Sequence, residues 1–124
     1  MELDKQTKTV DFKWKDITFK VRAAATRGDR HDKNMLLFSH TDGTGKVIPP
    51  TLQEVQEFLI RQFVTGWEGV EKGGKAVPFS WENLNGIPDS DVEGIDEDVI
   101  FLLGNFVSEN CGLFSRKEAE RKNA

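Results

Sequence analysis

An alternation of apolar and polar residues near the start of the chain constrains the fold more strongly than any other feature. Between residues 9 and 24, apolar side chains recur at every second position in two short runs. They are Val10, Phe12 and Trp14, then Ile17, Phe19 and Val21. A period of two is typical of strands with one buried face, so the two runs predict a β-hairpin.

The register of this hairpin follows from the position of its turn. With Lys15-Asp16 as a two-residue turn, Asp11 falls opposite Lys20 on the polar face. The apolar pairs are then Trp14 with Ile17, Phe12 with Phe19, and Val10 with Val21. A slip by one residue would turn the apolar face to water, so the pattern itself predicts the register.

The strongest helical pattern begins at Thr51. The run Thr51-Leu52-Gln53-Glu54 matches a capping box, in which the Thr hydroxyl and the Glu carboxylate bond backbone N–H groups of the first turn. Apolar residues follow at helical spacing, so we expect a helix over about 51–65 that ends at Gly66. Because its apolar side chains cover most of its circumference, this helix should be covered on two sides.

Two further helices are expected toward the C-terminus. A short helix over about 81–87 would be capped by Ser80 and closed by Pro88. A longer helix over about 96–110 has acidic residues at its positive N-terminal end and Gly112 as its C-cap.

The segments between these elements lack a helical pattern of apolar residues. We expect a charged loop at 25–34 and a short third strand at Met35–Phe38. A short return strand is expected at Val47-Ile48, before Pro49-Pro50 stops it.

The predicted architecture is α+β. An N-terminal β-hairpin or small antiparallel sheet packs against the two main helices and the short one. The whole chain, 1–124, is expected to be one domain, with flexible ends at 1–8 and 115–124.

Composition narrows the class of protein. The 124 residues carry a net charge of −4, which argues against a general nucleic-acid binder with a basic face. The single cysteine, Cys111, cannot form an internal disulfide, as is typical of a reducing compartment. Because there is neither a secretory signal nor an apolar run near the ~20 residues of a membrane span, we expect a cytoplasmic protein that binds neither membrane nor nucleic acid.

The motifs that could carry chemistry are incomplete. Asp89–Gly94 resembles the start of a calcium loop, but the twelfth position, which should be glutamate, is Ile100. Gly43–Lys46 lacks the flanking residues of a phosphate-binding loop. Neither histidine has zinc-ligand spacing with the cysteine. We therefore expect no catalytic residue, no metal and no cofactor, and a protein that is not an enzyme.

Three aromatic residues are candidates for contact with another protein. Phe101 lies nearly opposite the buried stripe of its predicted helix, beside the small residues Gly104 and Ser108, an arrangement that suits close helix–helix approach. A lone exposed Phe is also ordinary on protein surfaces. Trp67 and Trp81 flank a turn, and they either hold that turn against the core or stay exposed as partner anchors.

The central stretch carries a family resemblance. A tryptophan-containing turn, a glycine spacer, a Pro-Phe-Ser turn and a Glu-Asn-Leu helix follow one another. They are Trp67-Glu68-Gly69-Val70, Gly73-Gly74, Val77-Pro78-Phe79-Ser80 and Glu82-Asn83-Leu84, with Asp98-Val99-Ile100 further on. Over about residues 50–110 this resembles the tail assembly chaperones of long-tailed double-stranded-DNA bacteriophages. The second helix departs from the family pattern, because Gly86-Ile87-Pro88 cut it short.

The resemblance implies a function without catalysis. Proteins of this kind bind the long, helical tape measure protein in the host cytoplasm, help to recruit tail tube subunits, and are absent from the finished virion. Self-association of several copies along the client is compatible with this role. The partner-binding residues that we expect are Trp67, Val70, Phe79, Trp81 and Phe101.

Two other functions stay open at this point. A structural tail or head–tail protein would remain in the purified particle. A small acidic inhibitor of a host protein would act through Asp89–Asp98, mimicking nucleic acid with steep salt dependence. A chaperone predicts weak salt dependence instead, and loss of binding on Trp67→Ala or Phe101→Ala.

Overall fold

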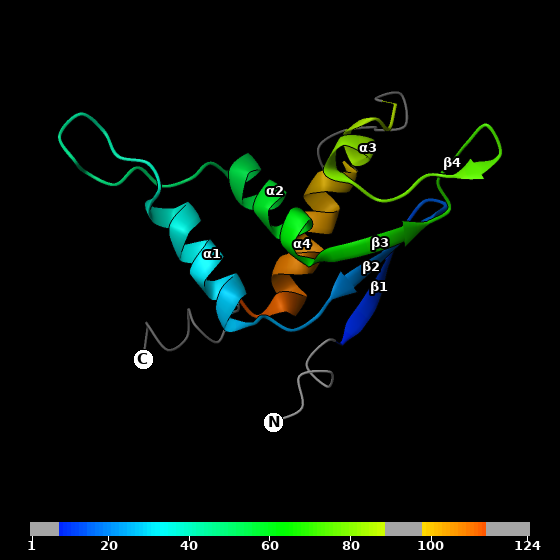
Figure 1. The fold of residues 1–124 in the computed structure, drawn as a ribbon, viewed down its shortest axis with the longest axis horizontal. Coiled ribbons are helices and arrows are strands. Elements are labelled where there is room, and N and C mark those ends of the chain that lie inside the picture. Colours follow the sequence, from blue (N-terminus) through cyan, green and yellow to red (C-terminus); the bar gives the residue numbers. More distant parts are fainter. Residues whose placement is uncertain (1–7, 89–97, 114–124) are drawn as a thin grey trace.

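The computed structural model describes residues 8–88 and 98–113, which form a three-stranded antiparallel sheet, a small separate hairpin and four helices (Figure 1). The order is β1 (Thr9–Trp14), β2 (Ile17–Arg22), α1 (Arg27–Phe38), α2 (Leu52–Phe63), β3 (Val64–Glu68), β4 (Glu71–Lys72), β5 (Lys75–Ala76), α3 (Trp81–Asn85) and α4 (Val99–Cys111). The predicted α+β class is confirmed. The expected flexible ends lie outside the described residues, apart from Lys8.

The predicted hairpin is confirmed together with its register. Strands β1 and β2 pair in the expected order, from Trp14 opposite Ile17 to Val10 opposite Val21. Lys15 in the turn adopts φ 52°, and on the polar face Lys20 Nζ lies 3.0 Å from Asp11 Oδ1. The apolar face is the buried one, as the alternation requires.

The helix that begins at Thr51 runs directly into a strand, which the sequence analysis did not predict. The capping box is present, with Glu54 N–H donating to the Thr51 hydroxyl. The helix ends at Phe63, and Gly66 does not end it but lies inside β3, opposite Lys20 of β2. The open edge of β2 offers backbone partners to the residues after Phe63, and β-branched and aromatic residues there suit a strand.

Two predictions for residues 25–38 are wrong, because most of these residues form helix α1. Residues 25–34 were expected to be a loop and Met35–Phe38 a strand, but both belong almost entirely to this helix. Its start is a capping box that the sequence contains: the Thr26 hydroxyl accepts from Asp29 N–H, and the Asp29 carboxylate accepts from Thr26 N–H. The tripeptide Arg27-Gly28-Asp29 lies in the first turn of this helix, and the Asp29 carboxylate is buried. The expected strand at Val47-Ile48 reduces to an isolated bridge between Thr41 and Val47.

The inner side of α1 is polar rather than apolar. Its buried residues are Asp29 and Lys33. Asp29 accepts two hydrogen bonds from the Arg22 guanidinium, at 2.5 and 2.8 Å, and a third from Gln62 Nε2 at 2.7 Å. Lys33 Nζ donates to the Leu113 carbonyl at 3.2 Å, beyond the end of α4. These contacts join α1 to the end of β2, to α2 and to the end of α4.

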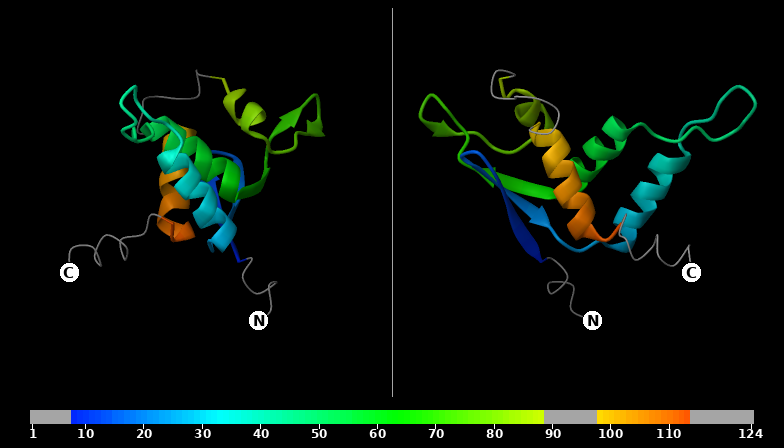
Figure 2. Two further views of the ribbon diagram at one scale, coloured as in Figure 1. Left: turned by 60° about the vertical axis from the view of Figure 1, so that its left-hand side comes forward. Right: turned by 180° about the vertical axis from the view of Figure 1, so that it is seen from behind.

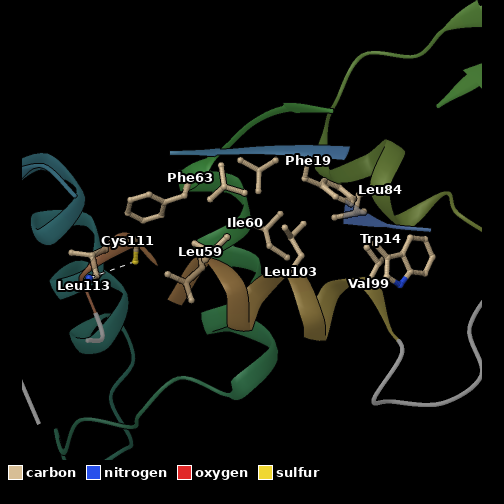
Figure 3. Close-up of a cluster of buried hydrophobic side chains, with 13 residues drawn as sticks. Trp14, Phe19, Leu59, Ile60, Phe63, Leu84, Val99, Leu103, Cys111 and Leu113 are labelled. Atoms are coloured by element: carbon tan, nitrogen blue, oxygen red, sulfur yellow. Dashed lines mark hydrogen bonds between the residues drawn. The ribbon is translucent and has the colours of Figure 1, made fainter. Parts of the chain in front are cut away.

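The hydrophobic core lies where the sheet meets α2 and α4 (Figure 3). Phe19 and Val21 of β2 are fully buried against residues of both helices, chiefly Leu59, Ile60 and Phe63 of α2 and Leu103 and Val107 of α4. Leu84 brings α3 into the same cluster. Helix α1 lies beside α2, on the side away from the sheet (Figure 2).

Helix α4 starts slightly later than expected. Asp98 is its N-cap, accepting from Ile100 N–H at 3.1 Å, and Gly112 ends it with φ 83°, as predicted. Residues 89–97 lie outside the described part of the chain, so the acidic loop, its calcium-like motif and the charges of Asp96 and Glu97 are not tested. Within residues 8–88 and 98–113, every helix is too short or too polar to cross a membrane.

Acid should weaken the fold through Asp29. Burial opposes ionisation of this carboxyl group, but the hydrogen bonds from Arg22, Gln62 and Thr26 outweigh it and hold its pKa well below the ordinary value of 3.8. A carboxyl group whose pKa is depressed by folding contributes full stability above its unfolded pKa of about 4 and loses it as the pH falls. We expect Asp29→Asn to lower the free energy of unfolding by about 3 kcal/mol at pH 7 and to flatten its decline below pH 4, measured by urea denaturation.

The exposed ion pair between Lys20 and Asp11 provides the matched control for this prediction. Asp11→Asn removes the surface partner of Lys20 and should cost less than about 1 kcal/mol. Equal losses for the two variants would contradict the anchoring role of Asp29.

Two glycines of the β3 region should differ sharply when replaced by alanine. Gly69 has φ 97°, and a Cβ there would lie 2.2 Å from the Asp16 carbonyl oxygen of the β1–β2 turn. Gly66 has no atom within 4 Å of the same position. We expect Gly69→Ala to destabilise by at least about 2 kcal/mol, and Gly66→Ala to change the midpoint of thermal unfolding little. Similar losses at both positions would show that the β1–β2 turn does not contact Gly69 as described.

Candidate functional site

A cleft of about 860 Å³ runs along α2. Its apolar lining comes from four helices. These residues are Leu36 of α1, Leu52 and Phe58 of α2, Trp81 of α3, and Ile100 and Phe101 of α4. A pocket of this volume can hold several side chains of a partner.

Three acidic side chains line the cleft, and together we call them its acidic rim. They are Glu54, Glu57 and Asp98, and Arg61 is the cation among the described lining residues. Arg61 is already paired, because its Nε lies 3.2 Å from Glu57 and its Nη2 lies 3.8 Å from Glu82 of α3. The pKa of Glu54 is lowered, first by the hydrogen bond from Thr51 N–H and also by His40 nearby, so this carboxylate is firmly anionic at neutral pH.

A buried amide at the cleft lacks a partner. Gln56 is 7% exposed, lines the cleft, and its Nε2 has no hydrogen-bond partner in the described part of the chain. Its side chain lies over Gly104 of α4, where an added Cβ would be 3.0 Å from Gln56 Cγ. A buried donor without an acceptor costs free energy, so such a group in a cleft indicates a place where an incoming acceptor would be stabilised.

Gly104, one of the two small residues that the sequence analysis placed beside Phe101, packs inside the protein. Gly104 is buried against α2 and permits the close approach of α4 to that helix. Phe101 itself is half-buried and lines the cleft. The predicted helix–helix approach is therefore made within this chain, while the ring next to it borders the hollow.

The other expected partner-binding residues fall into two places. Trp67 and Phe79 stack edge to face at 5.2 Å between ring centroids, and both rings also contact Phe19. The indole N–H of Trp67 donates to the Val77 carbonyl at 2.7 Å, so this side chain holds β3 to the segment before α3. Val70 is half-buried nearby.

Trp81 is placed differently from Trp67. It is half-buried at the first position of α3, where the Arg61 guanidinium lies 5.8 Å from its ring centroid. It borders the cleft together with Phe101. Of the five residues expected to bind a partner, Trp81 and Phe101 are therefore the two that line the cleft.

The sequence analysis missed a set of exposed apolar side chains, one of which also lines the cleft. All of the large exposed apolar residues that the structure describes fall between positions 35 and 52. They are Met35 and Phe38 of α1, Val47 and Ile48 of the connection, and Leu52 of α2. This connection extends away from the rest of the chain (Figures 1 and 2). The signal was present in the sequence, but the expected strands at Met35–Phe38 and Val47-Ile48 assigned four of these side chains to a sheet, and Leu52 was counted with the apolar residues of the helix over 51–65.

Within the described residues, His31, His40 and Cys111 lie on different parts of the fold. The described residues contain no cluster of three or more His, Cys, Asp or Glu side chains able to hold a metal ion. His40 lies 3.4 Å from Glu54, His31 is exposed on α1, and Cys111 is buried at the end of α4.

Comparison with protein-family models, curated proteins and solved structures found no match for this chain. The resemblance to phage tail assembly chaperones therefore stays a prediction from the motifs between residues 50 and 110.

Replacing the unpartnered amide should make the protein more stable. Gln56→Met keeps the length of the side chain and removes a buried donor that has no acceptor among the described residues. We expect the free energy of unfolding to rise by about 1 kcal/mol in urea denaturation. Asn83→Met is the contrasting substitution, because the Asn83 amide donates to the Pro78 carbonyl at 2.9 Å, and it should not stabilise. A loss of stability for Gln56→Met would mean that the amide is satisfied in solution.

Proposed function

We propose that this protein is a bacteriophage tail assembly chaperone that acts in the host cytoplasm. It holds the tape measure protein in a soluble form, helps to recruit tail tube subunits, and is absent from the mature virion. The proposed family follows from the resemblance of the motifs over about residues 50–110. The observation that carries the proposal in the structure is the set of exposed apolar side chains at positions 35–52, of which Leu52 lines the cleft along α2.

Apolar surface of this kind suits a protein that binds another chain without changing it covalently. Contiguous exposed apolar side chains beside a hollow are typical of sites that bury part of a partner. A long helical client offers repeated apolar faces, and helix-in-groove recognition binds such faces through side chains spaced one turn apart. Several copies along one client would add avidity to weak individual contacts.

The remaining surface supports solubility. The net charge of −4 keeps copies of the chaperone apart in spite of their exposed apolar residues. Because apolar side chains of the cleft would supply most of the affinity, binding should depend less on salt than binding through carboxylates alone.

Co-expression with the client tests the proposal. The client is the product of the long, coiled-coil-rich reading frame expected next to this gene. We expect its soluble fraction to rise several-fold when this protein is present, and to fall back with Leu52→Asp, which places a charge on an exposed apolar position at the start of α2. Ala76→Asp adds the same charge on exposed β5 and should retain the effect.

Mass spectrometry of purified particles separates the proposal from its main rival. A chaperone should be absent from the virion, whereas stoichiometric amounts would identify a structural tail or head–tail protein. No gain in client solubility with the unmodified protein would also refute the chaperone role.

A further inference from the structure

We infer that the cleft along α2 binds one face of an amphipathic helix whose flanks carry lysine or arginine. This inference rests on the proposed function, because it names the kind of client segment that is held and the place where it is held. Three independent features of the cleft support it: its apolar lining, its acidic rim and its unpartnered amide.

The lining accepts apolar side chains from a helix. The apolar lining residues of the cleft include Leu52, Phe58, Phe101, Leu36 and Trp81. A volume of about 860 Å³ holds a few side chains but not a whole helix. The matching partner therefore inserts the apolar residues of one face, at the i, i+3, i+4 and i+7 spacing, and leaves its opposite face outside.

The charges on the rim select the flanks of that helix. Glu54, Glu57 and Asp98 line the cleft, and the paired Arg61 does not neutralise all three. Basic residues beside the apolar face would lie near these carboxylates, whereas acidic residues would be repelled. Charge complementarity of this kind sets orientation and partner choice, while the buried apolar side chains supply most of the affinity.

The buried amide of Gln56 offers a polar contact in the cleft. Because Gln56 lines the cleft and its Nε2 has no acceptor in the described part of the chain, an acceptor on the seated partner can satisfy it. A helix supplies such an acceptor at its C-terminal turn, where backbone carbonyls lack intrahelical partners, or through a polar side chain. Because an unpartnered buried donor costs free energy, the bound state would gain what the unbound protein lacks at this amide.

Nuclear magnetic resonance with two designed peptides tests the inference on the full chain. Both peptides have about 20 residues, enough for measurable helix, with Leu at i, i+3, i+4 and i+7. One has Lys on its flanks and the other has Glu. We expect the Lys-flanked peptide to shift the Trp81 indole N–H and the Gln56 side-chain amide signals, and to leave the Trp67 indole N–H, which is bonded to Val77, in place. Its affinity should exceed that of the Glu-flanked peptide by about tenfold at low salt.

Matched variants locate the binding. Leu52 and Met35 are nearly equally exposed, at 61% and 59%, but Leu52 lines the cleft and Met35 does not. We expect Leu52→Asp to weaken binding of the Lys-flanked peptide by at least about tenfold and Met35→Asp to leave it nearly unchanged. Glu57→Lys should weaken it, whereas Glu71→Lys, the same charge change on β4, should not. Gln56→Met should weaken binding while the protein stays folded.

Three results would overturn the inference. Equal losses for Leu52→Asp and Met35→Asp would assign binding to the apolar surface in general. Equal affinity for the two peptides would remove the role of the acidic rim. Cleft signals that move with protein concentration, without peptide, would assign the cleft to a second copy of this chain. Each result leaves the chaperone proposal intact, because that proposal fails only if the client gains no solubility or the protein remains in the virion.

Discussion

The position of α1 on the rest of the fold depends on the side chain of Arg22. Its guanidinium leaves the end of β2, binds the Asp29 carboxylate with both terminal nitrogens, and donates further hydrogen bonds to the carbonyls of Ala24 and Gln62. It also lies over the Phe63 ring, 4.4 Å from the centroid. One planar group thus connects the sheet, the start of α1 and the end of α2, and its fork geometry matches the carboxylate. Because α1 carries Leu36, this contact also determines one border of the cleft.

The elements that could be predicted from the sequence are those whose apolar periodicity matches their geometry. In the β1–β2 hairpin, a two-residue period with bulky apolar side chains leaves one register that buries them, and the structure has that register. Helices α2 and α4 combine an apolar stripe with local end signals at Thr51 and Gly112, so their existence was clear and only their limits shifted. Local chemistry and tertiary packing favour the same conformation in these segments.

The elements that escaped prediction depend on contacts between distant residues. Helix α1 buries Asp29 and Lys33, so it has no apolar stripe to detect; its capping box at Thr26 was the available signal. Strand β3 exists because β2 lies next to it, which no local pattern contains. The cleft combines residues from Leu36 to Phe101. Sequence reasoning therefore identified Trp81 and Phe101 individually, but it could not show that they border the same hollow, nor that Trp67 holds β3 to the segment before α3.

The polar docking of α1 has a consequence for the motions of this protein. Helices that bury wide apolar stripes separate from a fold only when the whole core opens, since separation exposes that surface to water. Helix α1 is held on its inner side mainly by the hydrogen bonds of Asp29 and Lys33, so its separation would cost the free energy of those bonds but would expose little apolar surface. Its opening is therefore a local event of lower free energy than global unfolding, and its amide protons should exchange with solvent earlier than those of α2 and α4. A local opening of α1 would leave the hydrophobic core between the sheet, α2 and α4 in place.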